Sequence, residues 1–220
     1  MYSTIFISKN SDELSLLPSF FAANNSSLSA FSLIDFQAIP FEIKAPYDVL
    51  FFGSIRSFNF FTQLQNIPTH VQLACIGEGT ANRIKERGYQ LDFIGEFAGE
   101  PDKVAATFKA WLDTKRVLIP VSSQSNRSIA RALPTSQFEE VIVYSTVHKE
   151  IHIPPHDLYI FTSPSNVDSF LAVQEIPAKA TVIAWGTTTE KRLVEHGAEV
   201  MHSLRTSTEK ELINFLSKEL

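Results

Sequence analysis

The sequence predicts an α/β protein made of two similar domains, each with a mostly parallel sheet. Three observations lead to this fold class. Strand-like runs alternate with helical patterns along most of the 220 residues. The runs are largely apolar, as in parallel strands covered on both faces. Residues 48–88 also align without a gap onto residues 157–197, at a constant offset of 109.

The internal repeat sets the domain organisation. The 41 paired positions contain 12 identities, and unrelated segments of this length would share only a few. Two copies of this length differ from a solenoid, which needs several short repeats. We therefore expect two similar domains that face one another, with a ligand-binding cleft between them. The identical pairs are Asp48/Asp157, Phe52/Phe161, Ser54/Ser163, Phe61/Phe170, Gln65/Gln174, Ile67/Ile176, Pro68/Pro177, Gly77/Gly186, Thr80/Thr189, Arg83/Arg192, Glu86/Glu195 and Gly88/Gly197.

The elements follow from local pattern, in chain order. Before the first copy we expect a strand at 4–8, a helix at 12–23, and a strand plus linker at 28–43, where Pro40 argues against a central strand. Glycines that follow a helical pattern end it at Gly88 and Gly197. From the first copy to residue 144 we expect strands at 48–52, 71–76, 91–94, 117–120 and 140–144, and helices at 56–65, 80–87, 103–112 and 128–133.

The rest of the chain supplies the second copy. We expect a linker at 145–155, strands at 158–161 and 181–185, and helices at 167–173, 190–195 and 208–220. The second copy lacks a counterpart of residues 117–144, and the N-terminal strand has no partner in its own half. Both facts are explained if the N-terminal piece packs with the second copy. The predicted domains are thus residues 1–38 plus 150–220, and an inserted domain at 39–149.

Composition limits the functional classes. A net charge of −5 argues against nucleic acid, which is usually bound by a basic surface. The single cysteine, Cys75, can form no internal disulfide, so we expect a cytoplasmic protein. Burial as a small apolar residue is the favoured role for Cys75. We see neither a signal peptide nor an apolar run of about 18 residues, so we expect no membrane segment. No oligomerisation pattern is visible, and we expect a monomer.

Four turns between a strand and the following helix carry small polar residues. They are 53–56 and 77–80 in the first copy, and 162–165 and 186–189 in the second. A helix N-terminus offers unpaired N–H groups to an anion, and such turns lie where ligands bind in open α/β sheets. The alternative is that the hydroxyl residues only cap helices. The candidate substrate-binding residues here are Ser54, Arg56, Thr80, Ser163, Thr188 and Thr189.

Two further features lie outside the repeat. The polar turn that begins at Ser122 precedes a helix and carries Arg127 and Arg131, which could pair with carboxylates. Solvated basic residues are the alternative. Tyr144 ends an apolar strand beside the predicted linker and could offer a phenolic proton, although half-buried packing is the default role for such a residue. Ser122 and Tyr144 join the candidate site.

The sequence lacks the motifs of several common kinds of site. His148, His152 and His156 have a spacing of four, but Pro154 and Pro155 exclude a helix there and no further ligands complete a metal site. Phosphate-loop, dinucleotide and serine-nucleophile motifs are also missing. We therefore expect no metal site.

Together these residues resemble one family. The turn at 162–165 and its helix, the Gly186-Thr-Thr-Thr189 turn, the helix that ends in His196-Gly197, and Val143-Tyr144-Ser-Thr146 resemble uroporphyrinogen-III synthase. The resemblance covers nearly the whole chain. It implies two flavodoxin-like domains joined by a two-stranded linker, and a reaction that needs neither a metal nor an organic cofactor. It also implies a lyase of tetrapyrrole (haem) biosynthesis that dehydrates hydroxymethylbilane and closes it to uroporphyrinogen III, through a spiro intermediate that inverts the terminal ring.

The resemblance also assigns roles to residues. Tyr144 matches the family tyrosine that helps the hydroxyl leave. Ser54 with Arg56, Ser163, Thr80 and Thr189 match residues that bind substrate. Gly53 and Ile55 depart from the Thr and Pro found at 162 and 164, and Trp185 is bulky beside its turn. The small-molecule substrate carries eight carboxylates, so many distributed hydroxyl and amide donors suit it.

Two alternatives remain open. A non-enzymatic two-domain binder of a small anionic metabolite would share the α/β halves and the linker. A degenerate relative of the synthase with a signalling role would share the fold and lack activity. Coupled cyclisation, and replacement of Tyr144 by Phe, separate these possibilities.

Overall fold

The computed structural model describes residues 2–97 and 99–219. The chain divides into two compact units: unit 1 is Met1–Asp35 with Val147–Leu220, and unit 2 is Phe36–Thr146. The chain therefore passes between units at 35/36 and 146/147, whereas the sequence placed these passages at 38/39 and 149/150.

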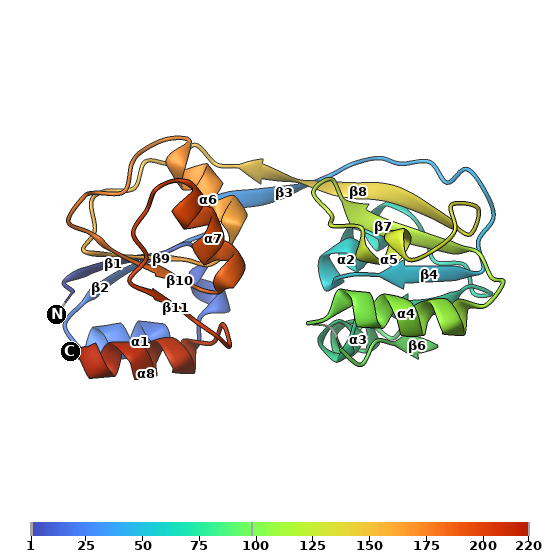
Figure 1. Cartoon of the computed structure of the whole chain (residues 1–220), viewed down its shortest axis with the longest axis horizontal. Coiled ribbons are helices and arrows are strands. Elements are labelled where there is room, and N and C mark those ends of the chain that lie inside the picture. Colours follow the sequence, from blue (N-terminus) through green and yellow to red (C-terminus); the bar gives the residue numbers. More distant parts are fainter. Residues whose placement is uncertain (1, 98, 220) are drawn as a thin grey trace. The chain divides into compact units, whose positions relative to one another are not determined.

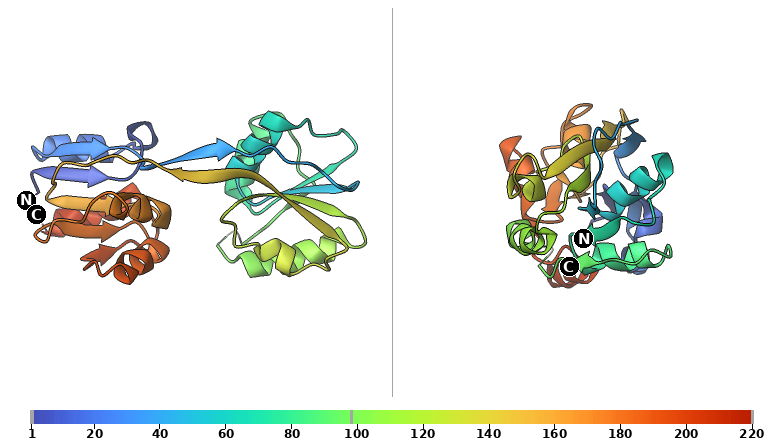
Figure 2. Two further views of the ribbon diagram at one scale, coloured as in Figure 1. Left: turned by 90° about the horizontal axis from the view of Figure 1, so that it is seen from above. Right: turned by 90° about the vertical axis from the view of Figure 1, so that its right-hand side faces the viewer.

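Among the described residues, unit 1 has one five-stranded parallel sheet in the order β11-β10-β9-β1-β2. Figure 2 shows this order as a run of colours from blue to red. Because β1 lies between β2 and β9, the N-terminal piece packs with the second copy, as the sequence predicted. The strands are β1 (Thr4–Ile7), β2 (Ser27–Ala30), β9 (Leu158–Phe161), β10 (Thr181–Ala184) and β11 (His202–Ser203).

Helices cover both faces of this sheet (Figure 1). One face carries α1 (Leu17–Ala23) and α8 (Glu209–Glu219), and the other carries α6 (Pro164–Leu171) and α7 (Thr187–Glu195). Side chains of a strand alternate between the faces. Accordingly Ile5 and Ile7 join one buried cluster and Phe6 joins the other.

Unit 2 has, within the part of the chain described, a six-stranded sheet in the order β3-β8-β7-β4-β5-β6. Helices α2 (Ile55–Leu64) and α3 (Glu78–Lys85) cover one face, and α4 (Pro101–Leu112) and α5 (Ser128–Arg131) cover the other. The strands are β3 (Ile34–Ala38), β4 (Val49–Phe52), β5 (Gln72–Cys75), β6 (Phe93–Ile94), β7 (Val117–Ser122) and β8 (Phe138–His148).

The two sheets share one spatial order but start at different strands. Strands β4, β5 and β6 take the places that β9, β10 and β11 hold in unit 1, while β7 and β8 take those of β1 and β2. Residues 117–144 therefore have a structural counterpart in the N-terminal β1-α1-β2 segment. Numbered along the chain, the sheet of unit 1 has the doubly wound order 2-1-3-4-5, whereas β4–β8 of unit 2 have the order 3-2-1-4-5, which is also doubly wound.

The passages between units lie in or beside two neighbouring strands. Strands β3 and β8 are adjacent in the sheet, and the backbone N–H of Ile39 donates to the carbonyl of Val143 at 2.9 Å. Strand β8 continues to His148. The linker expected at 145–155 is therefore wrong in its first part, because the partner strand extends β8 beyond the apolar run that ends at Tyr144.

Most identities of the repeat maintain the fold. Gly88 and Gly197 have φ values of 85° and 78°, the left-handed region that favours glycine after a helix. Asp157 accepts hydrogen bonds from the backbone of Ser3 and Thr4, and Asp48 accepts one from the backbone of Arg116. Each aspartate thereby joins the start of its strand to the neighbouring strand.

Several predicted helices begin at other residues, and two of them show why. The helix expected at 12–23 is a short 3₁₀ turn at Ser11–Glu13 followed by α1 from Leu17. The start of α1 is capped by the Glu209 carboxylate, which accepts the N–H groups of Ser15, Leu16 and Leu17, a contact invisible in the local sequence. Helix α7 begins at Thr187, so most of the turn expected at 186–189 is its first turn.

Candidate active site

Each sheet has one position where the chain connections turn in opposite directions. In unit 2 this switch point lies between β7 and β4, and in unit 1 between β1 and β9. Ligands of open α/β sheets bind beyond the carboxyl ends of the strands at such points. The two switch points are therefore the first places to look for a site.

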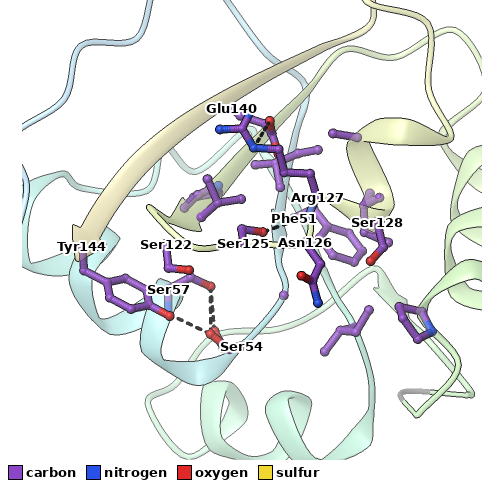
Figure 3. Close-up of a pocket in the computed structure, with 18 residues that line it drawn as sticks. Phe51, Ser54, Ser57, Ser122, Ser125, Asn126, Arg127, Ser128, Glu140 and Tyr144 are labelled. Carbon is purple, nitrogen blue, oxygen red and sulfur yellow. Dashed lines mark hydrogen bonds and ion pairs between the residues drawn. The ribbon is translucent and has the colours of Figure 1, made fainter. Parts of the chain in front are cut away.

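The switch point of unit 2 opens into a cavity of about 350 Å³ (Figure 3). The candidates Ser54, Ser122 and Tyr144 all line it, although they are far apart in sequence. Its polar lining is completed by Ser57, Ser125, Asn126, Arg127, Ser128 and Glu140, and its remaining lining by Phe51, Gly53, Ile76, Pro101, Ile119, Pro120, Val121, Ile129 and Ala130.

Two residues keep this switch point open. Pro120 has no backbone N–H to donate to β4, and the pairing of β4 with β7 covers only Val49/Val117 and Leu50/Leu118. Gly53, the first residue after β4, has no side chain, and a Cβ placed there would meet nothing within 4 Å. The cavity remains because β4 and β7 do not pair beyond Leu50/Leu118 and because Gly53 contributes no side chain to fill the space.

A β-bulge brings Tyr144 to the cavity. Strands β7 and β8 pair residue by residue as far as Val121 and Ile142, after which Ser122 pairs with Tyr144. The extra residue shifts the direction of the side chains that follow. The Tyr144 ring stacks on Phe60 with 5.0 Å between centroids, is 8% exposed, and points toward Ser54 and Ser57 in Figure 3. The Tyr144 ring is thus packed against Phe60 and still lines the cavity.

Ser54 and Arg56 begin helix α2. The hydroxyl of Ser54 accepts the backbone N–H of Ser57 at 3.1 Å, so Ser54 is an N-cap and also lines the cavity. Arg56 is exposed, and its guanidinium lies 3.7 Å from the centroid of the Phe36 ring. A cation on an aromatic face is a favourable contact that fixes the direction of the guanidinium.

Thr80 lies away from the cavity lining. It is the third residue of α3 and is half-buried, and its backbone N–H donates to the carbonyl of Gly77 at 3.1 Å. Helix α3 starts two residues before the position predicted, at Glu78. The structure therefore brings Ser54, Ser122 and Tyr144 together and leaves Arg56 and Thr80 outside the cavity lining, in the first turns of α2 and α3.

In unit 1 the equivalent switch point is closed by two hydroxyl residues. The backbone N–H of Thr162 donates to the Ser8 hydroxyl at 2.8 Å, and the Thr162 hydroxyl donates to the Ser8 carbonyl at 2.6 Å. The β1-β9 pairing also continues past Ile7/Ile160, because the N–H of Ser8 donates to the carbonyl of Ile160 at 3.0 Å. By strand register, Ser8 and Thr162 correspond to Pro120 and Gly53 of unit 2.

The remaining candidates lie at helix starts of unit 1. The Ser163 hydroxyl accepts the backbone N–H of Asn166 at 3.3 Å and its side-chain amide at 2.9 Å, so this serine caps α6. Thr188 is exposed on the first turn of α7, whereas Thr189 is only 2% exposed. The burial of Thr189 follows from the early start of α7, which turns its third residue toward the core.

Sequence reasoning missed the acidic residue of the cavity. Glu140 lies on β8, and its Oε2 is 3.6 Å from Nε of Arg127. Burial raises the pKa of the Glu140 carboxyl, and the nearby Arg127 charge acts in the opposite direction. An acidic residue near the start of an apolar run was the available signal, and it was read only as part of a strand.

Other titratable groups are less suited to chemistry. Burial raises the pKa of the Cys75 thiol, which favours its unreactive protonated form. Within residues 2–97 and 99–219, no group of three or more His, Cys, Asp or Glu side chains could hold a metal ion. Over the same residues, no helix is long and apolar enough to cross a bilayer.

The fold and cavity define a two-domain α/β protein with a site rich in hydroxyl groups and one buried tyrosine. A family model described as uroporphyrinogen-III synthase HemD matches residues 29–214, so this chain belongs to the uroporphyrinogen-III synthase family. That family consists of lyases that cyclise a small substrate in tetrapyrrole biosynthesis.

Solved structures agree on the fold. A uroporphyrinogen-III synthetase from Helicobacter pylori is 19% identical, with 99% of each chain covered and a TM-score of 0.72. A mutant uroporphyrinogen III synthase from Thermus thermophilus is 10% identical, with 98% of this chain and 97% of that chain covered and a TM-score of 0.60. No curated protein sequence matches the chain.

Proposed function

We propose that this protein dehydrates hydroxymethylbilane and closes it to uroporphyrinogen III, with the chemistry at the unit 2 cavity. Membership of the family supports the reaction. The single observation that supports the location is the meeting of Tyr144, Ser54 and Ser122 in one cavity at a switch point. A two-domain binder without activity is the less favoured alternative.

Tyr144 is the proposed catalytic residue. Its phenol gives a proton to the departing hydroxyl of the bilane, while a pyrrole nitrogen supplies the electron pair that expels it as water. The proton released when the ring closes returns to the phenolate. Stacking on Phe60 and the edge contact with Phe36 fix the ring, so the phenol is already oriented when substrate arrives. Ring closure then needs the two ends of the bilane to be held close together.

The proposed substrate-binding residues supply hydrogen-bond donors to carboxylates. In unit 2, Ser54 and Ser122 do so beside Tyr144 in the cavity, while Arg56 and Thr80 do so from the first turns of α2 and α3, outside the cavity lining. In unit 1 the proposed donors are Ser163, Thr188 and Thr189. Thr188 is the more accessible of the two threonines, so we expect it to contribute more than Thr189.

The broader setting belongs to the same proposal. We propose a cytoplasmic monomer that needs no metal or organic cofactor and binds no nucleic acid. The net charge of −5 and the unpaired Cys75 support this setting. We also propose that units 1 and 2 are the two domains of the family fold.

A coupled assay tests the function. The protein is mixed with a bilane-producing enzyme, and the isomers of uroporphyrinogen are separated. We expect the type III isomer from this protein, and about a hundredfold lower kcat for the Y144F variant, because one positioned proton donor is lost. If the wild-type protein binds a bilane analogue yet forms no type III isomer, the binder is the better description.

A further inference from the structure

The unit 2 cavity combines many donors with a single acid. Hydroxyl, amide and guanidinium groups dominate its polar lining, as expected for an anionic ligand. Among the described residues of the lining, the charged or titratable side chains are Arg127, Glu140 and Tyr144. An ionised Glu140 would repel a carboxylate that entered this cavity, so its presence needs an explanation.

The surroundings of Glu140 disfavour its ionised form. Its Oε1 is covered from solvent, and no described residue forms a hydrogen bond with it. Its Oε2 faces Nε of Arg127 at 3.6 Å, too long for a strong bidentate ion pair. A desolvated carboxylate with one loose partner is costly, whereas a neutral carboxyl is not.

Neighbouring charges do not change this assessment. The adjacent Glu139 is turned to other partners, since it accepts the backbone N–H of Lys44 at 2.8 Å and lies 3.7 Å from a guanidinium nitrogen of Arg116. The facing strand β7 contributes no charged residue over Val117–Ser122. Arg127 is therefore the charged group of the cavity lining that faces Glu140, and burial opposes its effect.

Arg127 is held in an unusual backbone conformation. Its φ of 54° and ψ of 30° lie in the left-handed region, where an arginine is uncommon. Its N–H donates to the Ser125 hydroxyl at 3.1 Å, and its side chain remains 53% exposed. Such conformations persist where the surrounding structure fixes them, often at ligand sites. In Figure 3 the Arg127 side chain lies beside Glu140 at one end of the cavity, with Tyr144 at the other.

We propose that this end of the cavity binds one carboxylate arm of the substrate, which pairs with Arg127 and accepts a hydrogen bond from a protonated Glu140. The proposal rests on the function proposed above and adds a specific subsite to it. A cavity of about 350 Å³ holds one pyrrole ring with its acetate and propionate arms more readily than a whole tetrapyrrole. Binding therefore takes up a proton, because the substrate carboxylate strengthens the preference of Glu140 for its neutral form.

Direct binding tests this linkage without relying on turnover. The probe is uroporphyrin III, the stable oxidised product that retains its carboxylates, titrated into the full-length protein between about pH 5 and pH 9. For the wild-type protein, we expect affinity to fall by up to about tenfold per pH unit once Glu140 ionises. The E140Q variant keeps an N–H donor in a neutral side chain, so its affinity loses that pH dependence.

Two further variants complete the test. R127Q removes the charge and should weaken binding by about tenfold or more at every pH. Q124A changes an exposed residue of the same loop outside the cavity lining and should bind as the wild-type protein does. The proposal is overturned if wild-type protein does not bind the probe, or if E140Q keeps the wild-type pH dependence. It is also overturned if E140Q loses turnover at unchanged affinity, since that outcome indicates proton transfer.

The coupled assay separates the two proposals. Type III product without proton-linked binding would support the proposed function and contradict the proposed subsite. Proton-linked binding without type III product would support the subsite and contradict the proposed function.

Discussion

The two switch points of this molecule share one spatial order of strands, and two paired positions account for the difference between them. In unit 1, Ser8 and Thr162 join the strand ends through side-chain hydrogen bonds, and the pairing of β1 with β9 extends past Ile7. In unit 2, Pro120 and Gly53 stand at the same places, the β4-β7 pairing stops early, and a cavity of about 350 Å³ opens. A duplicated fold can thus specialise one copy by losing one backbone donor and one side chain.

The difference also separates structural identities from functional ones. Several residues identical in both copies cap helices, end helices or join strands, and one of them, Ser54, also lines the cavity. Other residues that make the cavity differ between the units, as Gly53, Ile76 and Pro120 do where unit 1 has Thr162, Trp185 and Ser8. The identities therefore identify mainly the scaffold, and the departures show why only one switch point is open.

The largest expected effect comes from filling the open switch point. In the series Gly53→Ala, Gly53→Val and Gly53→Phe, the new side chain enters free space, so stability should change little. We expect kcat/KM to fall with side-chain size, by about a hundredfold for phenylalanine, because the substrate can no longer occupy the cavity. Steady-state kinetics with thermal melts measure both quantities. Wild-type kcat/KM for Gly53→Phe would show that the reaction occurs elsewhere.

Opening the closed switch point should cost stability instead. Ser8 is 1% exposed, and Ser8→Ala removes the acceptor of the Thr162 N–H. We expect a loss of about 2 kcal/mol in the free energy of unfolding, measured by urea denaturation, because a buried donor is left unsatisfied. Ser122→Ala at the other switch point is the matched variant and should cost less than about 0.5 kcal/mol. Equal losses in the free energy of unfolding for Ser8→Ala and Ser122→Ala would contradict the proposed difference between the two switch points.

The two helix caps provide a finer comparison. Ser54 and Ser163 cap α2 and α6 in the same way, since each hydroxyl accepts the backbone N–H of the residue three positions later. Replacement of either serine by alanine should therefore lower the free energy of unfolding by about 1 kcal/mol. Only Ser54 lines the cavity, whereas Ser163 also binds the Asn166 side chain. We therefore expect the larger fall in kcat/KM for Ser54→Ala. The threonine variants, which retain a cap, separate lost capping from lost substrate contact.

The smallest expected effect concerns acid stability. Hydrogen bonds from the Thr4 and Ser3 backbone and the Thr4 hydroxyl lower the pKa of Asp157. A lowered carboxyl pKa stabilises the fold above the unfolded value of about 3.9, and that contribution is lost as pH falls through the folded value. The Asp157→Asn variant should therefore melt below wild type at neutral pH, with the gap narrowing toward pH 3. Melting curves across this range check it, and a gap that widens in acid would contradict the account.

The sequence predicted the scaffold well, for a physical reason. Apolar runs such as 48–52 and 158–161 are long enough to identify buried strands, and glycines after helical patterns mark the helix ends. The boundaries that failed depend on distant partners. Glu209 caps α1 from the other end of the chain, and β3 extends β8 beyond Tyr144.

The site could be predicted only in part. Polar turns that precede helices suggest Ser54 and Ser122, and a phenol at the end of an apolar strand suggests Tyr144; all three line one cavity. The bulge that directs Tyr144 and the coverage of Glu140 arise from packing and have no local sequence signal. Thr189 was selected from a turn that is in fact a helix, and its side chain is buried.

The central claim is that this protein makes uroporphyrinogen III at the unit 2 switch point. The most direct measurement is the isomer composition from the coupled assay, with wild-type protein and Gly53→Phe run in parallel. The account predicts type III product from the wild-type protein, and the uninverted type I isomer once the cavity is filled and the bilane closes unaided. Type I product from the wild-type protein, or undiminished type III product from Gly53→Phe, would contradict it.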